Sequence, residues 1–196
     1  AGGAALGAKV ALIEKRRLGG DCLWTGCVPS KTLIKSAAVA HAMRHANRWA
    51  LAPHEPKPDL AAVMERVASV IRGIEPNDSP ERFRSLGVDV ILGEGRFVAR
   101  DAFEVNGRRL AAKSFVIATG SRPAMPPIPG LAESGALTNE TLFDLREDAP
   151  HLVVIGGGPI GCEMAQAFRR LGSEVTLVDV APRLLTREDA DLAEVV

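Results

Sequence analysis

The chain has 196 residues, of which 46% are apolar and 24% are charged, values that are ordinary for a globular protein. Its 24 basic and 24 acidic residues give a formal net charge of zero, so we expect neither nucleic acid nor an anionic membrane as a partner. No apolar run reaches the roughly 20 residues of a membrane span and no signal peptide is visible, so we expect a cytoplasmic protein.

The first predicted element is a buried strand that finishes in a carboxylate. Leu6 and Gly7 read as a helix ending, where glycine takes the left-handed cap conformation. The apolar residues 10–13 then lead to Glu14.

A cysteine pair follows the strand, and it is the most informative feature of the sequence. Cys22 and Cys27 lie just before a helical apolar pattern that continues to about residue 42. Residues five apart in a regular helix have Cα atoms about 8–9 Å apart, whereas a disulfide needs about 4.4–6.8 Å. A bridge therefore requires an irregular backbone, for which Gly26 offers freedom. Cys27 would then lie near a helix N-terminus, where the partial positive charge favours the thiolate.

Two plainer interpretations of the pair stay open. One is a structural disulfide, which is unusual in a cytosolic chain. The other is half of a zinc site, but no second Cys/His pair follows at ligand spacing, so we expect no metal. We interpret Cys162, His41 and His45 as ordinary packing or helix-surface residues.

The middle of the chain alternates between helical patterns, short strands and proline-rich connections. Three prolines make residues 53–58 a surface connector, and four more make residues 123–129 a stiff crossing. The elements expected around them are helices at about 59–74 and 77–86, short strands between 88 and 118 with the last at 114–118, and a short helix at 138–145.

The last part of the sequence carries a glycine-rich turn. A strand at 152–155 is followed by G-x-G-x-x-G, a helix from about 159 to 171 and a strand that ends at Asp179, 18 positions after the last glycine. The glycines permit a tight turn and close approach of a pyrophosphate to the helix N-terminus, and the carboxylate can bind a ribose. This order predicts dinucleotide binding; the alternative is a glycine-rich turn without a ligand.

The two strands that end in carboxylates are parts of an internal repeat. Residues 6–14 match residues 171–179 at an offset of 165. The phosphate loop of the first copy would lie before residue 1, and residues 191–196 read as the start of another helix. We therefore expect a piece of a larger protein.

Residues 19–31 resemble the active-site segment of the class I pyridine nucleotide-disulfide oxidoreductases, which include dihydrolipoamide dehydrogenase, glutathione reductase and mercuric reductase. The resemblance implies an α/β fold with two Rossmann-like dinucleotide-binding domains, both incomplete here. Residues 1–125 would belong to the FAD-binding domain, 126–150 to a crossover and 151–196 to the first half of the NAD(P)-binding domain. It also implies a homodimer whose acid–base histidine lies outside this chain, so the chain alone should be inactive.

The resemblance further implies roles for individual residues. Cys27 resembles the flavin-proximal charge-transfer cysteine, and Cys22 the interchange cysteine that meets a small-molecule or small disulfide substrate. Lys31 matches the lysine beside the flavin, and Glu163 the glutamate that pairs with it. The remaining implied positions are Glu14, Gly20, Gly95, Thr119, Gly120 and Ser121 for FAD, and Gly156, Gly157, Gly158, Pro159, Ile160, Gly161 and Asp179 for NAD(P).

Three positions depart from the family pattern. Asp21 replaces the common threonine before the first cysteine, and Trp24 and Thr25 replace a small pair, a change that could shape substrate access.

Asp179 favours NAD, because a carboxylate repels a 2′-phosphate, although nearby Arg183 keeps NADP open.

The implied function is a relay of electrons from NAD(P)H through FAD to the Cys22–Cys27 pair and then to the substrate. Glutathione, lipoamide, mercuric ion and quinones are not distinguished by these motifs. Two alternatives stay open. A flavin NAD(P)H oxidase or peroxidase typically uses one cysteine, and a non-catalytic redox-sensing module would use the disulfide only to switch conformation.

Overall fold

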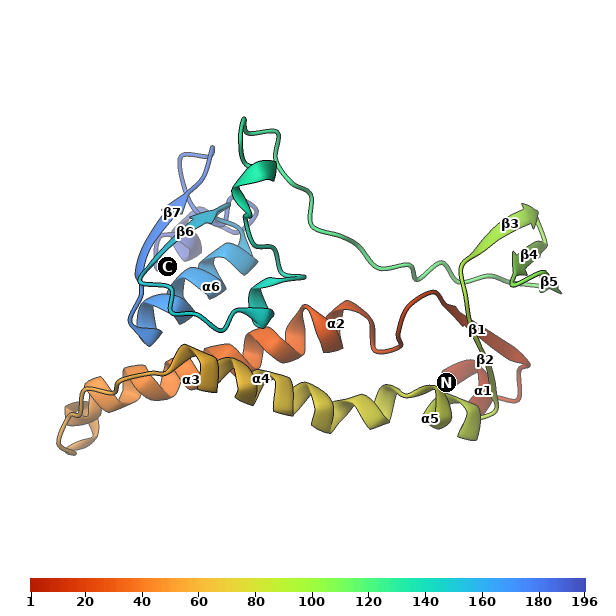
Figure 1. Ribbon diagram of the computed structural model, residues 1–196, viewed down its shortest axis with the longest axis horizontal. Coiled ribbons are helices and arrows are strands. Elements are labelled where there is room, and N and C mark those ends of the chain that lie inside the picture. The colour runs from red at the N-terminus through yellow and green to blue at the C-terminus, as the bar shows by residue number, and fades with distance from the viewer.

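The computed structural model describes residues 1–196, and it is elongated, with β-structure at both ends and long helices between them (Figure 1). At the N-terminal end, β1 (Val10–Glu14) pairs in parallel with β2 (Val88–Leu92), and Glu14 lies opposite Leu92. The short helices α1 (Gly2–Ala5) and α5 (Pro80–Ser85) belong to the same end. An antiparallel sheet follows with the order β3 (Gly95–Ala99), β4 (Ala102–Val105) and β5 (Arg108–Ala111).

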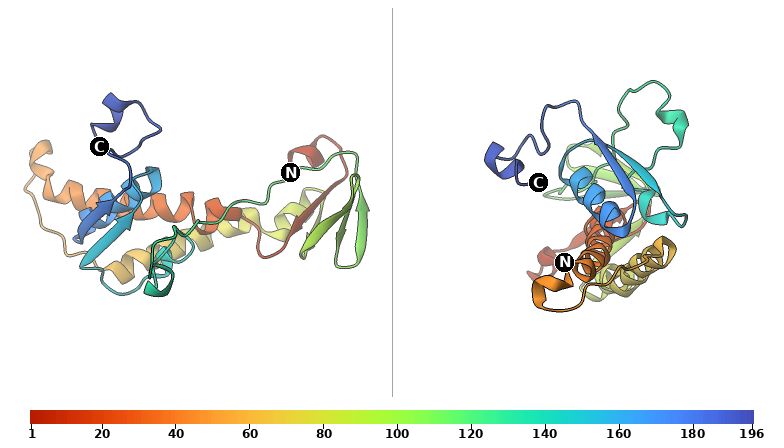
Figure 2. Two further views of the ribbon diagram at one scale, coloured as in Figure 1. Left: turned by 90° about the horizontal axis from the view of Figure 1, so that it is seen from above. Right: turned by 90° about the vertical axis from the view of Figure 1, so that its left-hand side faces the viewer.

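The middle of the molecule is helical. Its elements are α2 (Gly20–Trp24), α3 (Cys27–Arg44), the 3₁₀ turn η1 (Ala46–Trp49), α4 (Leu60–Ile74) and η2 (Glu75–Asp78). Asp59 is the N-cap of α4, because its side chain accepts a hydrogen bond from the Ala62 N–H. After β5, residues 112–128 run back towards the C-terminal end of the molecule as an extended segment, which Figure 2 shows from above.

The C-terminal end holds a second parallel strand pair. β6 (His151–Ile155) pairs with β7 (Glu174–Val178), and α6 (Pro159–Leu171) connects them. The short elements around this unit are η3 (Ala132–Ser134), η4 (Leu142–Asp144) and α7 (Ala190–Ala193). α6 ends at Gly172, whose φ is 110°, and Gly7 has a φ of 84°, so both predicted left-handed glycines are confirmed.

The main core lies where α3 packs between α4 and α6. Leu33 of α3, Met64 of α4 and Phe168 of α6 are all fully buried in one apolar cluster. This packing joins the helix that carries the cysteines to the helix that follows the glycine-rich turn. No helix combines the length and the apolar character that crossing a bilayer would require.

Some predicted elements are wrong or shorter than expected. Residues 114–118 form no strand, and the side chains of Val116 and Ile117 are 91% and 75% exposed. Their β-forming sequence has no neighbouring strand in this chain to supply hydrogen bonds. The helix expected at 138–145 is reduced to η4, and the pattern at 77–86 divides at Ser79, which caps α5 with Pro80 in its first turn.

The fold class is therefore α/β, as predicted, with one parallel strand pair at each end. Two strands do not make a complete Rossmann sheet, so the pair of Rossmann-like domains stays a prediction, as do the boundaries at residues 125 and 150. The proline-rich connector at 53–58 has no regular structure, as expected from its composition.

Candidate active site

Cys22 and Cys27 form a disulfide with a Cα–Cα distance of 4.6 Å. The spacing allows this because α2 stops at Trp24 and α3 starts again at Cys27. The predicted irregularity at Gly26 is confirmed, but its reason is close packing and not a left-handed backbone, since φ there is −128°. A Cβ on Gly26 would lie 2.9 Å from the Asp21 carbonyl oxygen, so a larger residue would push the turn open.

Cys27 is the first residue of the 18-residue helix α3. The unpaired N–H groups and the partial positive charge of a helix N-terminus stabilise a thiolate there. Both cysteines are exposed, so a reaction partner can reach the disulfide from solvent.

Trp24 lies between the cysteines and is fixed by two contacts. Its indole N–H donates to the Leu18 carbonyl oxygen at 2.7 Å, and the Arg17 guanidinium lies 3.6 Å from its ring centroid. This is a cation–π contact of the usual geometry. A pocket of about 220 Å³ opens beside Trp24 and Thr25, with Phe143 and Asp144 on its far side.

Lys31 and Glu163 meet although they are far apart in the sequence. The Lys31 Nζ lies 2.7 Å from Oε1 and 2.9 Å from Oε2 of Glu163. Lys31 follows Cys27 by one turn of α3, and Glu163 lies in the first turns of α6. Because the two side chains are 61% and 38% exposed, the pair adds little to folding stability, and its main effect is to hold Lys31 in place.

The glycine-rich turn between β6 and α6 is shaped to admit a ligand. A Cβ on Gly161 would overlap the Gly156 carbonyl oxygen, whereas one on Gly156 or Gly158 would meet nothing within 4 Å. The turn therefore presses against its own helix on one side and leaves open space on the other. Pro159 begins the 13-residue helix α6, whose N-terminal N–H groups face a bound anion in such turns. Ile160 is exposed at the same end of the helix. These residues fit a dinucleotide.

The carboxylate of Asp179 lies at the end of β7 and is fixed by backbone donors. It accepts from the Gly157 N–H at 2.5 Å and from the Ala181 N–H at 2.7 Å. These bonds, that of Gly157 first, hold the pKa of Asp179 below its ordinary value of 3.8. Arg183 is occupied elsewhere, since its guanidinium donates to the carbonyl oxygens of Leu185, Thr186 and Glu188.

The internal repeat extends to this hydrogen-bond geometry. Glu14, at the end of β1, accepts from the Arg16 N–H at 2.8 Å, as Asp179 accepts from the N–H two residues after it. Both carboxylates therefore lie at the end of a parallel strand and bind the backbone N–H two residues later, and their roles at an adenosine ribose stay a prediction.

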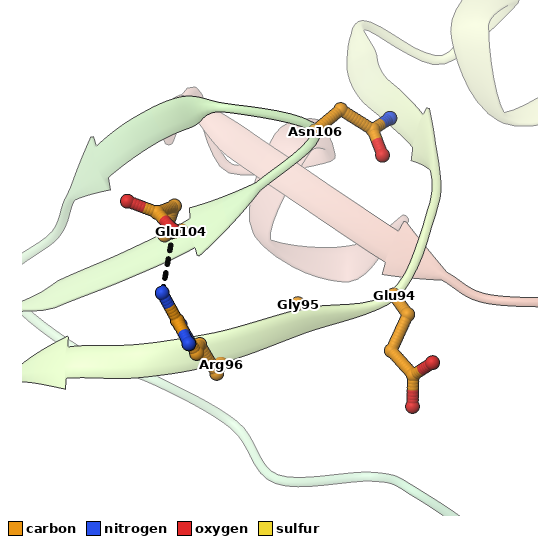
Figure 3. A pocket seen from close by; sticks show the side chains of 5 residues that line it. All are labelled: Glu94, Gly95, Arg96, Glu104 and Asn106. Carbon is orange, nitrogen blue, oxygen red and sulfur yellow. Dashed lines mark hydrogen bonds and ion pairs between the residues drawn. The ribbon is translucent and has the colours of Figure 1, made fainter.

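Gly95 and a polar pocket lie at the start of β3, next to the end of β2 (Figure 3). A Cβ on Gly95 would overlap the Phe103 ring, so packing against β4 already requires this glycine. The pocket has a volume of about 430 Å³, and sequence reasoning found none of its other lining residues, which are Glu94, Arg96, Glu104 and Asn106. No spacing pattern marks them, because the β3–β4 pairing and the following turn bring them together.

The predicted turn at residues 119–121 lies beside the redox-active loop. The Ser121 N–H donates to Oδ2 of Asp21 at 3.2 Å, and Gly120, with φ of 69°, faces the same carboxylate. Thr119 is exposed in the extended segment that leads into this turn. Gly20, with φ of 59°, opens α2 just before Asp21. The structure thus gathers the predicted FAD positions into two places, one at Glu14 and Gly95 and one at Gly20 and the 119–121 turn.

A profile of the pyridine nucleotide-disulphide oxidoreductase family matches residues 2–196. The chain belongs to this family.

Similar proteins agree with this assignment. The chain is 38% identical over 188 residues to a mercuric reductase from Lysinibacillus sphaericus, covering 96% of the chain and 34% of that protein. It is 36% identical to a dihydrolipoyl dehydrogenase from Chlamydia trachomatis, with coverage of 96% and 41%. Among solved structures, the HOCl-induced flavoprotein disulfide reductase RclA from Escherichia coli superposes with a TM-score of 0.78 at 31% identity, covering 97% of the chain and 41% of RclA. The chain thus spans between a third and a half of the length of these relatives.

Proposed function

We propose that the protein is an FAD-dependent NAD(P)H:disulfide-type oxidoreductase that works through the Cys22–Cys27 pair. One arrangement supports this most directly. The disulfide stands at the start of α3, and Lys31, one turn further along that helix, is bonded to Glu163 beside the glycine-rich turn. A redox centre and a dinucleotide turn are thereby held on two helices that share a core.

The residues present fit both cofactors. Glu14 would hold the adenosine end of FAD, and the 119–121 turn and Gly20 would lie along it, while Gly156–Gly161 and Asp179 would hold NAD(P)H. Bound FAD supplies a two-electron carrier between the nicotinamide and the disulfide. Lys31 would be held against that carrier by Glu163.

The cysteines carry the chemistry that this chain itself provides. Two electrons and two protons convert the disulfide to a dithiol, and the N-terminus of α3 favours the thiolate form of Cys27. With a disulfide substrate, the Cys22 thiolate attacks one sulfur, a mixed disulfide forms and one substrate thiolate leaves. Cys27 then attacks the Cys22 sulfur, the internal disulfide forms again and the second substrate thiolate leaves, so the substrate is reduced and the pair is oxidised.

The nucleotide preference proposed here is NAD. The ionised Asp179 would repel a 2′-phosphate, and the Arg183 guanidinium is engaged with three loop carbonyl oxygens.

The test uses the full-length protein. We expect it to be yellow and, on two-electron reduction with NADH, to develop the long-wavelength absorption of a thiolate beside an oxidised flavin. Cys27→Ser should abolish that absorption and Cys22→Ser should keep it. A colourless protein, or a Cys27→Ser variant with the parent's reduced spectrum, would contradict the proposal.

The same preparation separates the alternatives and the substrates. A flavin oxidase or peroxidase would keep its turnover with oxygen or peroxide in the Cys22→Ser variant, whereas the proposed enzyme would lose reduction of its substrate. A steady-state screen with oxidised glutathione, lipoamide, mercuric ion and a quinone, with NADH and NADPH in parallel, identifies the acceptor. Size-exclusion chromatography with light scattering tests the expected homodimer.

A further inference from the structure

The extended segment after β5 passes the redox-active loop with few attachments. Between residues 113 and 125 the backbone makes no hydrogen bond to other backbone groups. The Phe115 ring stacks edge-on with Phe97 at 5.0 Å, near the three-stranded sheet. Where the segment reaches α2, its position must therefore depend on contacts that involve at least one side chain.

The first attachment is the Asp21 carboxylate. Its Oδ2 accepts from the Ser121 N–H at 3.2 Å. A Cβ on Gly120 would lie 3.0 Å from the same oxygen, at a φ of 69° that other residues rarely adopt. The φ of Gly120 favours glycine, and any larger residue there would also have to displace the Asp21 carboxylate by a few tenths of an ångström.

The second attachment comes from the other side of the turn. The Arg122 guanidinium binds both carboxylate oxygens of Glu140, with Nε–Oε1 at 3.1 Å and Nη2–Oε2 at 3.3 Å. This fork-like bond lowers the pKa of Glu140 and raises that of Arg122. Glu140 thus keeps the negative charge that holds Arg122.

These two attachments close into a ring around the redox-active loop. Asn139, the neighbour of Glu140, donates from Nδ2 to the Thr25 carbonyl oxygen at 3.2 Å. The Thr25 N–H in turn donates to the Asp21 carbonyl oxygen at 2.9 Å. We call this closed set the polar ring; its members are Asp21, Ser121, Arg122, Glu140, Asn139 and Thr25.

We propose that Asp21 is a positioning residue, whose carboxylate fixes the 119–122 turn against the loop that carries Cys22 and Cys27. This rests on the proposed function, because the turn would lie along FAD. Asp21 directly precedes Cys22 and Thr25 lies two residues before Cys27, so the polar ring is attached to the reactive loop at two points next to the cysteines. One carboxylate oxygen of Asp21 holds the turn by accepting this hydrogen bond, and the negative charge of Asp21 contributes less to holding it.

The test compares three variants of the full-length protein. Asp21→Ala removes the acceptor, Asp21→Asn keeps an oxygen of the same reach, and Asp101→Ala removes an exposed carboxylate that makes no side-chain bond. Amide hydrogen exchange of the peptide that contains residues 119–122 reports the position of the turn, with or without cofactor. The FAD dissociation constant, from flavin fluorescence, reports the consequence for binding.

We expect Asp21→Ala to raise both the exchange rate and the FAD dissociation constant by about tenfold, the effect of losing one hydrogen bond. Asp21→Asn should stay near the parent, and Asp101→Ala should match it. The assignment would be overturned by an unchanged exchange rate in Asp21→Ala, or by equal increases in the exchange rate in Asp21→Ala and Asp21→Asn. If Asp21→Ala does not fold, Glu140→Ala tests the ring from its other side by removing both acceptor oxygens of Arg122; the same increase in exchange is expected, and an unchanged rate would contradict the proposal.

The outcomes also distinguish this proposal from the proposed function. A protein without flavin would contradict the proposed function, yet the exchange of the 119–122 amides would still test Asp21. A normal flavoprotein spectrum with unchanged exchange in Asp21→Ala would contradict the role of Asp21 alone.

Discussion

The carboxylate of Asp179 binds the glycine-rich turn and, in the proposed enzyme, would also hold the ribose of the nucleotide. The Gly157 and Ala181 N–H groups keep its pKa low, so the carboxylate is ionised throughout the neutral range and would repel a 2′-phosphate. Asp179→Ala should therefore reduce the preference for NADH over NADPH by about tenfold, the effect of removing one charged contact.

The measurement is the ratio of kcat/KM for the two nucleotides. Asp189→Ala serves as a control, since Asp189 precedes the short helix α7 and its side chain makes no capping bond. An unchanged ratio in Asp179→Ala would show that this carboxylate does not select the nucleotide.

The charge of Glu163 can be removed with little change in the shape of its side chain. Glu163→Gln keeps one acceptor oxygen for Lys31 but removes the ion pair, so the lysine is held less firmly than by the two carboxylate oxygens. We expect the rate of flavin reduction by NADH to fall by about tenfold, while the free energy of unfolding changes by less than about 1 kcal/mol because the pair is partly exposed.

Stopped-flow absorbance and denaturant unfolding measure these two quantities. The matched control is Glu65→Gln, which breaks the exposed ion pair between Glu65 and Arg72 on α4 and should change neither. If the two variants reduce the rate equally, the effect is one of general surface charge and not of Lys31.

At the scale of elements, two glycines of the glycine-rich turn have different roles: Gly161 is needed for packing, and Gly158 leaves room for a ligand. A Cβ on Gly161 overlaps the Gly156 carbonyl oxygen, so Gly161→Ala must displace α6 from β6. We expect it to lower the free energy of unfolding by more than about 2 kcal/mol, as overpacking against backbone does. NADH binding should weaken as well.

Gly158→Ala is the matched comparison. A Cβ there meets nothing within 4 Å in the protein, and φ is −76°, so the folded state accepts it. The new methyl group would project into the open side of the turn, where a pyrophosphate would lie. The Michaelis constant for NADH should therefore rise by about tenfold or more with stability unchanged. Equal stability losses in both variants would contradict this division.

The elements that sequence reasoning recovered are those with a local cause. The glycine caps, the break between α2 and α3 and the order β6–turn–α6–β7 all follow from residues within one or two turns of each other. The strand at 114–118 failed because a strand needs a neighbour, and pairing is not written in the segment itself.

The candidate site divides in the same way. The cysteine spacing and the G-x-G-x-x-G motif are local, and both were found from the sequence. The polar ring was not, because Ser121 and Asn139 reach the redox-active loop across more than 90 residues of chain. Asp21 and Thr25 were noted as departures from the family pattern and Ser121 as an implied FAD position, but none of these signals indicated that the three residues are linked.

At the scale of the whole molecule, α3 links the redox centre to the main core. Its buried face packs against both α4 and α6, and Arg44 near its end donates to the Arg170 carbonyl oxygen at the end of α6. Most of the stability should therefore come from this three-helix packing and little from the disulfide, whose loop is short.

Reduction of the Cys22–Cys27 bond should lower the free energy of unfolding by only about 2 kcal/mol, the value that chain entropy gives for so short a loop. Denaturant unfolding of the full-length protein, oxidised and after treatment with a thiol reductant, measures the difference, and the Cys22→Ser/Cys27→Ser double variant controls for the reductant. Loss of cooperative unfolding on reduction would show that the disulfide holds the fold together.

The chain has two tryptophans, and Trp24 is one of the four residues between the cysteines, held by contacts with Arg17 and with the Leu18 carbonyl oxygen. Indole emission depends on nearby charge and on quenching by sulfur, so this side chain is an optical reporter built into the reactive loop. In a Trp49→Phe background Trp24 would be the one indole left in this chain, and its fluorescence would follow the opening and closing of the disulfide in real time, without any added label.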